Sequence, residues 1–292
     1  MHADVGNEFF NSLVEVGLYR GPRRARPQSR RILAMARETT MKRFALVVLA
    51  ASAALAGPLA VCAQDSTPWD YEGKRGSLVW GKLDPGYQAC SKGHEQSPVD
   101  IRGAHLNKAL QPLEFHYIAG SVALENTGHT IRAYPAKGSY MVANGVRYEL
   151  VRFEFHHPSE SAVKGTLTDM DVDLVHKSAD GKVAILNLQL VEDRGAANAV
   201  MATLWPHLPL NPGATEKVAE FVNPAGFIPA DPGYWTYMGS LTAPPCTEGV
   251  RWFVFEQPLA ISREQLRRFA ALYKVNSRPL QDIGKRKIEA DE

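Results

Sequence analysis

The sequence predicts a mainly β protein with some α-helix, folded as a single domain on a large, mostly antiparallel sheet. Short runs of alternating apolar and polar residues dominate the chain beyond residue 120, and turn-forming pairs such as Asn144-Gly145 and Asp180-Gly181 separate some of them. Such runs and turns are typical of antiparallel strands joined by hairpins. No internal repeat, low-complexity linker or charge block divides residues 64–292, which favours one domain.

The first 63 residues are predicted to be absent from the mature protein. Residues 41–63 begin with Lys42 and Arg43, continue with an apolar run of 13 residues and end in small residues, which is the pattern of a secretory signal peptide. The run is shorter than the roughly 20 residues of a membrane-spanning helix. We therefore expect cleavage after Ala63, a periplasmic or secreted protein, and no transmembrane anchor. Residues 1–40 are interpreted as an upstream extension, with translation starting at Met41.

The predicted elements follow in chain order. One helix is expected over residues 261–273, where Ser262 can cap the first turn and Gln265 can complete a capping box. The apolar positions of this helix fall on one face, which indicates a scaffold role. The predicted strands are residues 121–124, 130–134, 140–142, 148–156, 171–176, 183–190 and 251–255.

Charge and cysteine content indicate which partners are disfavoured and whether a disulfide forms. The whole chain has a formal charge of +2, but residues 1–63 hold nine basic and four acidic residues, so the predicted mature chain carries −3. A mildly acidic chain without basic clusters does not favour nucleic acid or an anionic membrane as a partner. Only Cys90 and Cys246 remain after the leader. In an oxidising compartment we expect them to form a disulfide.

Several motifs stand in a characteristic order along the predicted domain. They are Trp69, Tyr71, Gly73, Gly76 and Trp80; Gln96-Ser97-Pro98-Val99-Asp100-Ile101; Asn126-Thr127-Gly128-His129-Thr130; Pro158-Ser159-Glu160; Leu174-Val175-His176; Tyr237-Met238-Gly239-Ser240-Leu241-Thr242; Pro244-Pro245-Cys246; and Asn276, Arg278, Pro279 and Gln281. From Trp69 almost to the C-terminus, the chain resembles an α-class carbonic anhydrase of the bacterial, exported type.

This resemblance implies a large twisted sheet with a conical cavity, at whose base three histidines bind zinc. Zinc lowers the pKa of its bound water, and the resulting hydroxide hydrates CO2 to bicarbonate. An enzyme with this activity is a lyase and is also called carbonate dehydratase. By resemblance, Thr242 orients the hydroxide, Glu160 fixes that threonine and His129 is the proton shuttle. The apolar CO2 pocket corresponds to Val175, Ile185, Leu241, Val250 and Trp252.

Two of the three zinc positions do not carry histidine. The positions that match the ligands are Glu154, His156 and Asp173, and Arg152 stands where the family has a supporting glutamine. Residues two apart on a strand share a face, so Arg152, Glu154 and His156 point one way and Val151, Phe153 and Phe155 into a core. Neither His157 nor His176 can replace a ligand without a register slip.

We therefore expect hydratase activity to be strongly reduced or lost, as in a pseudoenzyme. An Arg152–Glu154 ion pair and a His156–Asp173 pair, with Asp171 as a further acceptor, would form a polar network without metal. The first alternative is an active enzyme that holds zinc or another divalent metal through Glu154, His156 and Asp173, with CO2 and bicarbonate as its partners. The second is a non-catalytic envelope protein with a binding or structural role. The sequence indicates no protein partner.

Overall fold

The computed structural model describes residues 67–291, which belong to one compact unit spanning Ala63–Glu292. The predicted upstream extension, signal peptide and cleavage site lie outside the described residues. Among residues 67–291, no helix is both long enough and apolar enough to cross a membrane.

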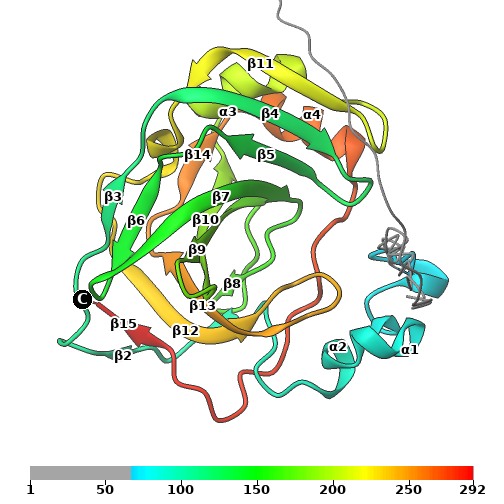
Figure 1. Ribbon diagram of the computed structural model, residues 1–292, viewed down its shortest axis with the longest axis vertical. Helices are drawn as coiled ribbons and strands as arrows, with labels where there is room; N and C mark the ends of the chain where they lie inside the picture. The colour runs from blue at the N-terminus through cyan, green and yellow to red at the C-terminus, as the bar shows by residue number, and fades with distance from the viewer. Residues whose placement is uncertain (1–66, 292) are drawn as a thin grey trace, which may run out of the picture. The chain divides into compact units, whose positions relative to one another are not determined.

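The unit is built on a sheet of 13 strands (Figure 1). Its main path runs β11-β4-β5-β7-β9-β10-β13-β12-β15-β2, while β3, β6 and β14 join at the side. Most neighbours are antiparallel, but β10 pairs in parallel with β13 and β14, and β15 with β2, so the sheet is mixed. The mainly β, mostly antiparallel prediction is confirmed.

All seven predicted strands are present, and the structure adds others. The strands are β1 (Asp100–Ile101), β2 (His105–Leu106), β3 (Glu114–His116), β4 (Gly120–Asn126), β5 (Ile131–Pro135), β6 (Tyr140–Ala143), β7 (Val146–His156), β8 (Ala162–Val163), β9 (Met170–Ser178), β10 (Val183–Glu192), β11 (Thr215–Val222), β12 (Tyr234–Ser240), β13 (Glu248–Phe255), β14 (Leu259–Ile261) and β15 (Glu289–Ala290). Strands β1 and β8 form a separate two-stranded sheet.

Helices are short and few in the described region, as expected. The predicted C-terminal helix is α4, and it contains the expected capping box between Ser262 and Gln265. The α-helices are α1 (Trp80–Leu83), α2 (Ala89–Lys92), α3 (Ala199–Leu204) and α4 (Arg263–Leu272), and 3₁₀ turns cover Gly73–Arg75, Pro85–Tyr87, Trp205–His207 and Pro224–Phe227.

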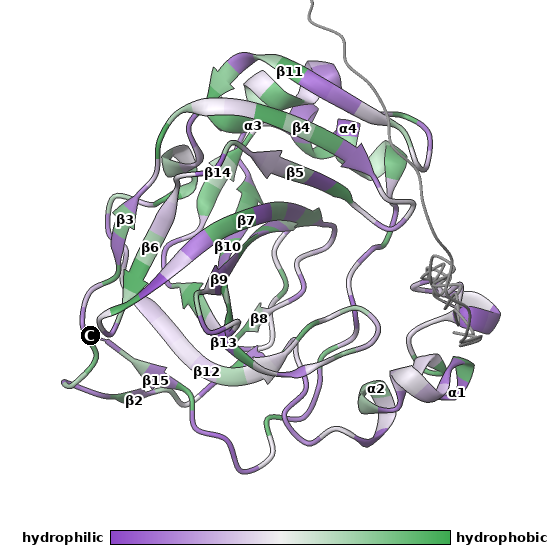
Figure 2. Cartoon of the chain, in the orientation of Figure 1, coloured by the Kyte–Doolittle hydropathy of each residue, from purple (hydrophilic) through white to green (hydrophobic). Residues whose placement is uncertain are grey.

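Strand β7 separates the hydrophobic core from a polar cavity. Phe153 and Phe155 are fully buried, and Phe155 packs against Trp205 and Phe269 of the helical layer. Hydrophilic and hydrophobic bands alternate along β7 in Figure 2. The prediction for Val151 was wrong: its side chain is 42% exposed, because a register shift between Leu150 and Arg152 interrupts the β7–β9 ladder there.

The predicted disulfide is confirmed. Cys90 of α2 is bonded to Cys246, which follows β12. Both cysteines belong to a small buried cluster with Trp80 and Tyr87. The bond therefore joins the N-terminal helical segment to the loop that carries Thr242 at the edge of the cavity.

Candidate functional site

A cavity opens over strands β5, β7 and β10 and the loop after β12. The space within it, part of which is open to solvent, amounts to about 510 Å³. Its polar lining comes mainly from β5 and β7, whereas much of its apolar lining comes from β10 and the loop. The lining residues are Trp69, Tyr71, His129, Thr130, Arg132, Arg152, Glu154, His156, Ile185, Leu241, Thr242, Ala243 and Pro244.

Glu154 lies between two arginines. On the sheet it stands opposite Arg132 of β5 and Asp173 of β9. Arg132 Nε donates to Glu154 Oε2 over 2.8 Å, and Arg152 donates from Nε and Nη2 to the two carboxylate oxygens, each over 3.2 Å. Burial raises the pKa of Glu154, but the charges of Arg152 and Arg132 lower it to about 2. Its carboxylate is therefore ionised and held by two guanidinium groups.

His156 is buried at the end of β7 among carboxylates. Its Nδ1 lies 3.1 Å from Asp171 Oδ1 and 3.9 Å from Glu160 Oε2. Burial lowers the pKa of His156, but the charge of Glu160 and the hydrogen bond with Asp171 raise it to about 10. His156 is therefore an imidazolium at neutral pH, and its Nδ1 donates to Asp171.

Asp173 does not form the expected pair with His156. Its Oδ1 accepts a 2.7 Å hydrogen bond from Asn187 Nδ2, and the same amide nitrogen donates to Asp171 Oδ2 over 2.9 Å. Burial and the charge of Asp171 raise the pKa of Asp173 well above its usual range. Asn187 thus bridges the two aspartates, and Asp171 rather than Asp173 is the partner of the imidazolium.

Glu160 and Thr242 are brought together, as the resemblance implies. Thr242 lies beside Glu160, and its hydroxyl lowers the pKa of that carboxyl, while the backbone N–H of Arg278 donates to Glu160 Oε1 over 3.3 Å. Burial and the nearby Asp171 raise the pKa of Glu160 to about 7, although the charge of His156 opposes this. The other oxygen, Oε2, is buried without a hydrogen-bond partner in the described region.

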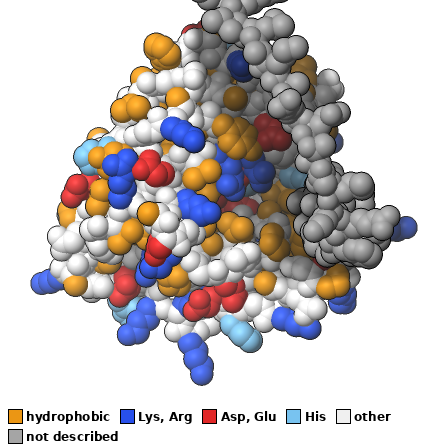
Figure 3. Space-filling view, in the orientation of Figure 1, with side chains coloured by type: hydrophobic (Ala, Val, Ile, Leu, Met, Phe, Trp, Pro, Cys, Tyr) orange, Lys and Arg blue, Asp and Glu red, His pale blue; other side chains and the backbone are white. Residues whose placement is uncertain are grey.

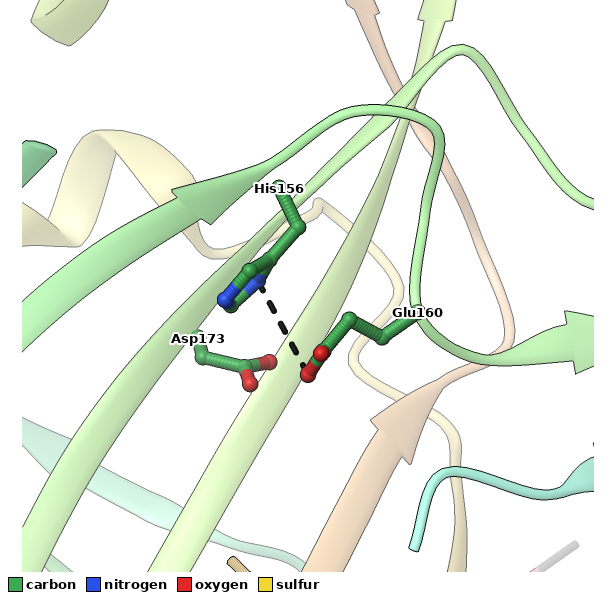
Figure 4. A group of neighbouring side chains, drawn as sticks. All are labelled: His156, Glu160 and Asp173. Atoms are coloured by element: carbon green, nitrogen blue, oxygen red, sulfur yellow. Dashed lines mark ion pairs between the residues drawn. The ribbon is translucent and has the colours of Figure 1, made fainter. Parts of the chain in front are cut away.

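Three buried side chains converge beneath the cavity, and only His156 among them lines it (Figure 4). One potential ligand atom from each of His156, Glu160 and Asp173 lies within 4.8 Å of the others, and all three residues are buried. The resemblance matches Glu154, His156 and Asp173 to the zinc ligands, whereas the group that converges in the structure contains Glu160 in place of Glu154. Glu154 itself faces Arg132 and Arg152 instead.

His129 lines the same cavity as Thr242 but lies against the N-terminal segment. Its ring stacks on Trp69 with centroids 3.7 Å apart, and its Nε2 lies 2.8 Å from the carbonyl oxygen of Trp69. His129 is half-buried. A residue at this place touches both the cavity and the segment that borders its entrance.

The predicted CO2-pocket residues lie together. Val175, Ile185, Val250 and Trp252 belong to one buried cluster, and Leu241 packs against it. Ile185 and Leu241 are the members that reach the cavity surface. The apolar wall is therefore present beside the altered polar base.

Sequence reasoning missed two residues of the polar network, Arg132 and Asn187. Arg132 lies in the predicted strand 130–134, yet its contact with Glu154 depends on the pairing of β5 with β7. Asn187 faces Asp173 through the β9–β10 register. The only signal was a polar side chain between two apolar neighbours, at Arg132 between Ile131 and Ala133 and at Asn187 between Leu186 and Leu188.

Comparisons with known proteins agree on one family. Residues 75–292 match the sequence profile of eukaryotic-type carbonic anhydrases. A carbonic anhydrase of Pectobacterium carotovorum is 36% identical over 235 residues, which cover 79% of this chain and 95% of that protein. The α-carbonic anhydrase of Thermovibrio ammonificans, solved with sulfanilamide, superposes with a TM-score of 0.74 at 34% identity, covering 76% of this chain and 99% of that one. Dioscorin, solved with ascorbate, gives 0.71 at 30% identity, covering 76% and 97%.

Proposed function

This chain belongs to the eukaryotic-type (α) carbonic anhydrase family, and from that premise we propose that it is an exported member whose CO2 hydration is strongly reduced or lost. The family's reaction is the reversible hydration of CO2, and the fold is that of the family. What differs is the set of side chains at the base. The proposal concerns this set and the ligands that the cavity accepts.

The residues at the zinc positions do not fit a zinc ion well. The observation that carries the proposal is the double pairing of Glu154 with Arg132 and Arg152. A metal that used this carboxylate would compete with three charge-assisted hydrogen bonds from two guanidinium groups. The two guanidinium groups would also repel the incoming cation. Glu154 is therefore a poor first ligand.

The protonation of His156 supports the same conclusion. A histidine binds metal only through an unprotonated ring nitrogen, so an imidazolium must first lose its proton. The surrounding carboxylates, which raise the pKa of His156 to about 10, make that loss costly near neutral pH. In this proposal, the proton on His156 and the two arginines supply positive charge at the base of the cavity.

A second candidate is a carboxylate-rich metal site with residual activity, involving zinc or another divalent ion. The observation in its favour is the convergence of His156, Glu160 and Asp173, together with the unpartnered Glu160 Oε2. Carboxylate and imidazole are acceptable ligands for zinc and manganese. Two anionic ligands would, however, reduce the ability of the ion to acidify bound water.

A third candidate is a non-catalytic envelope protein that uses the cavity for binding. The support is the solved complex of dioscorin with ascorbate, because dioscorin has this fold and holds a small organic molecule. This candidate is compatible with lost hydration and differs only in what the cavity does.

The test is stopped-flow CO2 hydration by the mature protein in the presence of added zinc. We expect a rate close to that of buffer alone. Rapid hydration with one zinc per chain would overturn the proposal. Glu160→Gln separates the second candidate, because metal content should fall in this variant only if Glu160 is a ligand.

A further inference from the structure

Arg132 and Arg152, here called the arginine pair, leave the cavity wall with excess positive charge. Both line the cavity, and both use the single carboxylate of Glu154 as their acidic partner. Two cations therefore face one anion. The buried carboxylates Glu160, Asp171 and Asp173 do not line the cavity. A ligand that enters meets the arginine pair before it meets those carboxylates.

Hydrogen-bond donors remain available on this wall. Arg152 bonds to Glu154 through Nε and Nη2, and its Nη1 donors have no hydrogen-bond partner in the described part of the chain. Tyr71 also lines the cavity, and its hydroxyl forms no hydrogen bond within residues 67–291. Burial and the charge of Glu160 raise the pKa of Tyr71, so its hydroxyl remains a donor.

One side of the cavity surface is apolar. Ile185 comes from β10, and Leu241 and Pro244 come from the loop after β12. The arginine pair comes from β5 and β7, on the other side of β9 in the sheet order. On the face seen in Figure 3, cationic and hydrophobic side chains lie close together. Such a cavity suits a ligand with one anionic end and one apolar end.

We propose that this cavity binds a small organic carboxylate, with its head at the arginine pair and Tyr71 and its apolar body against Ile185, Leu241 and Pro244. Guanidinium and carboxylate groups match in geometry and charge. The proposal rests on the proposed function, because a resident zinc ion would itself be the preferred anion receptor.

The probe is benzoate, measured by calorimetry on mature protein whose zinc content is known. Benzamide has the same shape without the charge, and bicarbonate has a similar head without the apolar body. We expect saturable 1:1 binding of benzoate and binding of both other probes weaker by roughly tenfold or more, as expected for the loss of a charged hydrogen bond or a buried ring.

Arg152→Gln and Arg132→Gln should each weaken benzoate binding by roughly tenfold. The matched control is Arg147→Gln, which removes an exposed arginine of the same strand that pairs with Glu149 and should leave binding unchanged. If one of these two variants fails to fold, the other still tests whether the arginine pair binds benzoate.

Binding of benzamide or bicarbonate as tight as that of benzoate would overturn the inference, as would an unaffected Arg152→Gln variant. Dialysis against a chelator separates the two proposals. Benzoate binding that is lost with the chelator but survives Arg152→Gln assigns the anion to a metal and contradicts both proposals. Little zinc with no benzoate binding contradicts this inference alone.

Discussion

Glu154 is the residue on which the polar network depends. Glu154→Gln removes the shared anion and leaves the guanidinium groups of Arg132 and Arg152 facing each other without a partner. We expect the free energy of unfolding to fall by about 1–3 kcal/mol, because desolvated charges are costly when unpaired. Urea denaturation measures it. Glu149→Gln breaks an exposed pair with Arg147 on the same strand and should cost less than about 1 kcal/mol. Equal losses in the two variants would count against a special role for Glu154.

His156 should make the free energy of unfolding fall at alkaline pH. Its pKa rises from 6.5 to about 10 on folding, so the folded protein holds a proton that the unfolded chain releases. The resulting stabilisation is full below about pH 6.5 and is lost as pH rises through 10, with a slope of up to about 1.4 kcal/mol per pH unit. Denaturation at several pH values should show this decline, and His156→Gln should flatten it. The exposed His116→Gln serves as the control and should retain the decline.

Residue partners were only partly predictable from the sequence. The Arg152–Glu154 contact follows from spacing within one strand, since residues two apart share a face. The partner of His156 depends instead on the register between β7 and β9, which places it opposite Asp171. The contact of Arg132 with Glu154 depends likewise on which strand pairs with β7. A sequence alone does not specify either pairing.

At the scale of elements, the sequence predicted half-buried strands such as β4 and the fully buried strands β9 and β10, and it missed strands that lack a clear pattern. Strand β11 was missed because it has only two buried residues, Val218 and Val222, on an edge of the sheet. Strand β12 was missed because its sequence mixes aromatic, polar and glycine residues without alternation and lacks the run of aliphatic residues that marks β10. The bulge at Val151 also left no mark in the pattern, since a valine is equally common in a core.

The facing positions of β7 and β9 allow a site of three zinc-binding histidines to be rebuilt. Glu154 and Asp173 are directly opposed, so Glu154→His with Asp173→His should place two imidazoles beside His156. Arg152→Gln removes a repelling cation. We expect this triple variant to gain zinc and measurable hydratase activity, and either histidine substitution alone to gain much less, because ligands act as a unit. Metal analysis and stopped-flow hydration measure the gain.

Arg132 provides a further check on the repaired site. In the triple variant its guanidinium loses Glu154 and faces the metal, so adding Arg132→Gln should tighten zinc binding. A folded triple variant without zinc would contradict the assigned register of β7 and β9. A variant that binds zinc and stays inactive would show that residues other than the metal ligands also prevent hydration.

At the scale of the whole molecule, the disulfide stabilises the N-terminal segment against the sheet. Cys90 and Cys246 are 156 residues apart, for which the chain-entropy account gives a contribution of about 5 kcal/mol before any strain. Denaturation with and without reductant should show a loss of this order. A Cys90→Ser, Cys246→Ser double variant should show the lower stability in both conditions. Unchanged stability on reduction would mean that the segment is held by packing alone.

Export and maturation are tested by mass spectrometry of the secreted or periplasmic protein. We expect a chain that begins near Gln64 and is two hydrogens lighter than its reduced form, as one disulfide requires. Peptides from residues 1–40 in the purified protein would contradict the interpretation of Met41 as the start.

We infer that a proton on His156 and the arginine pair have taken the place of the zinc of this family. This inference is tested most directly by the zinc content of the mature protein after equilibrium dialysis against micromolar free zinc at neutral pH. The account predicts far less than one equivalent per chain, because Glu154 is held by Arg132 and Arg152 and His156 is protonated. One tightly held equivalent would contradict it.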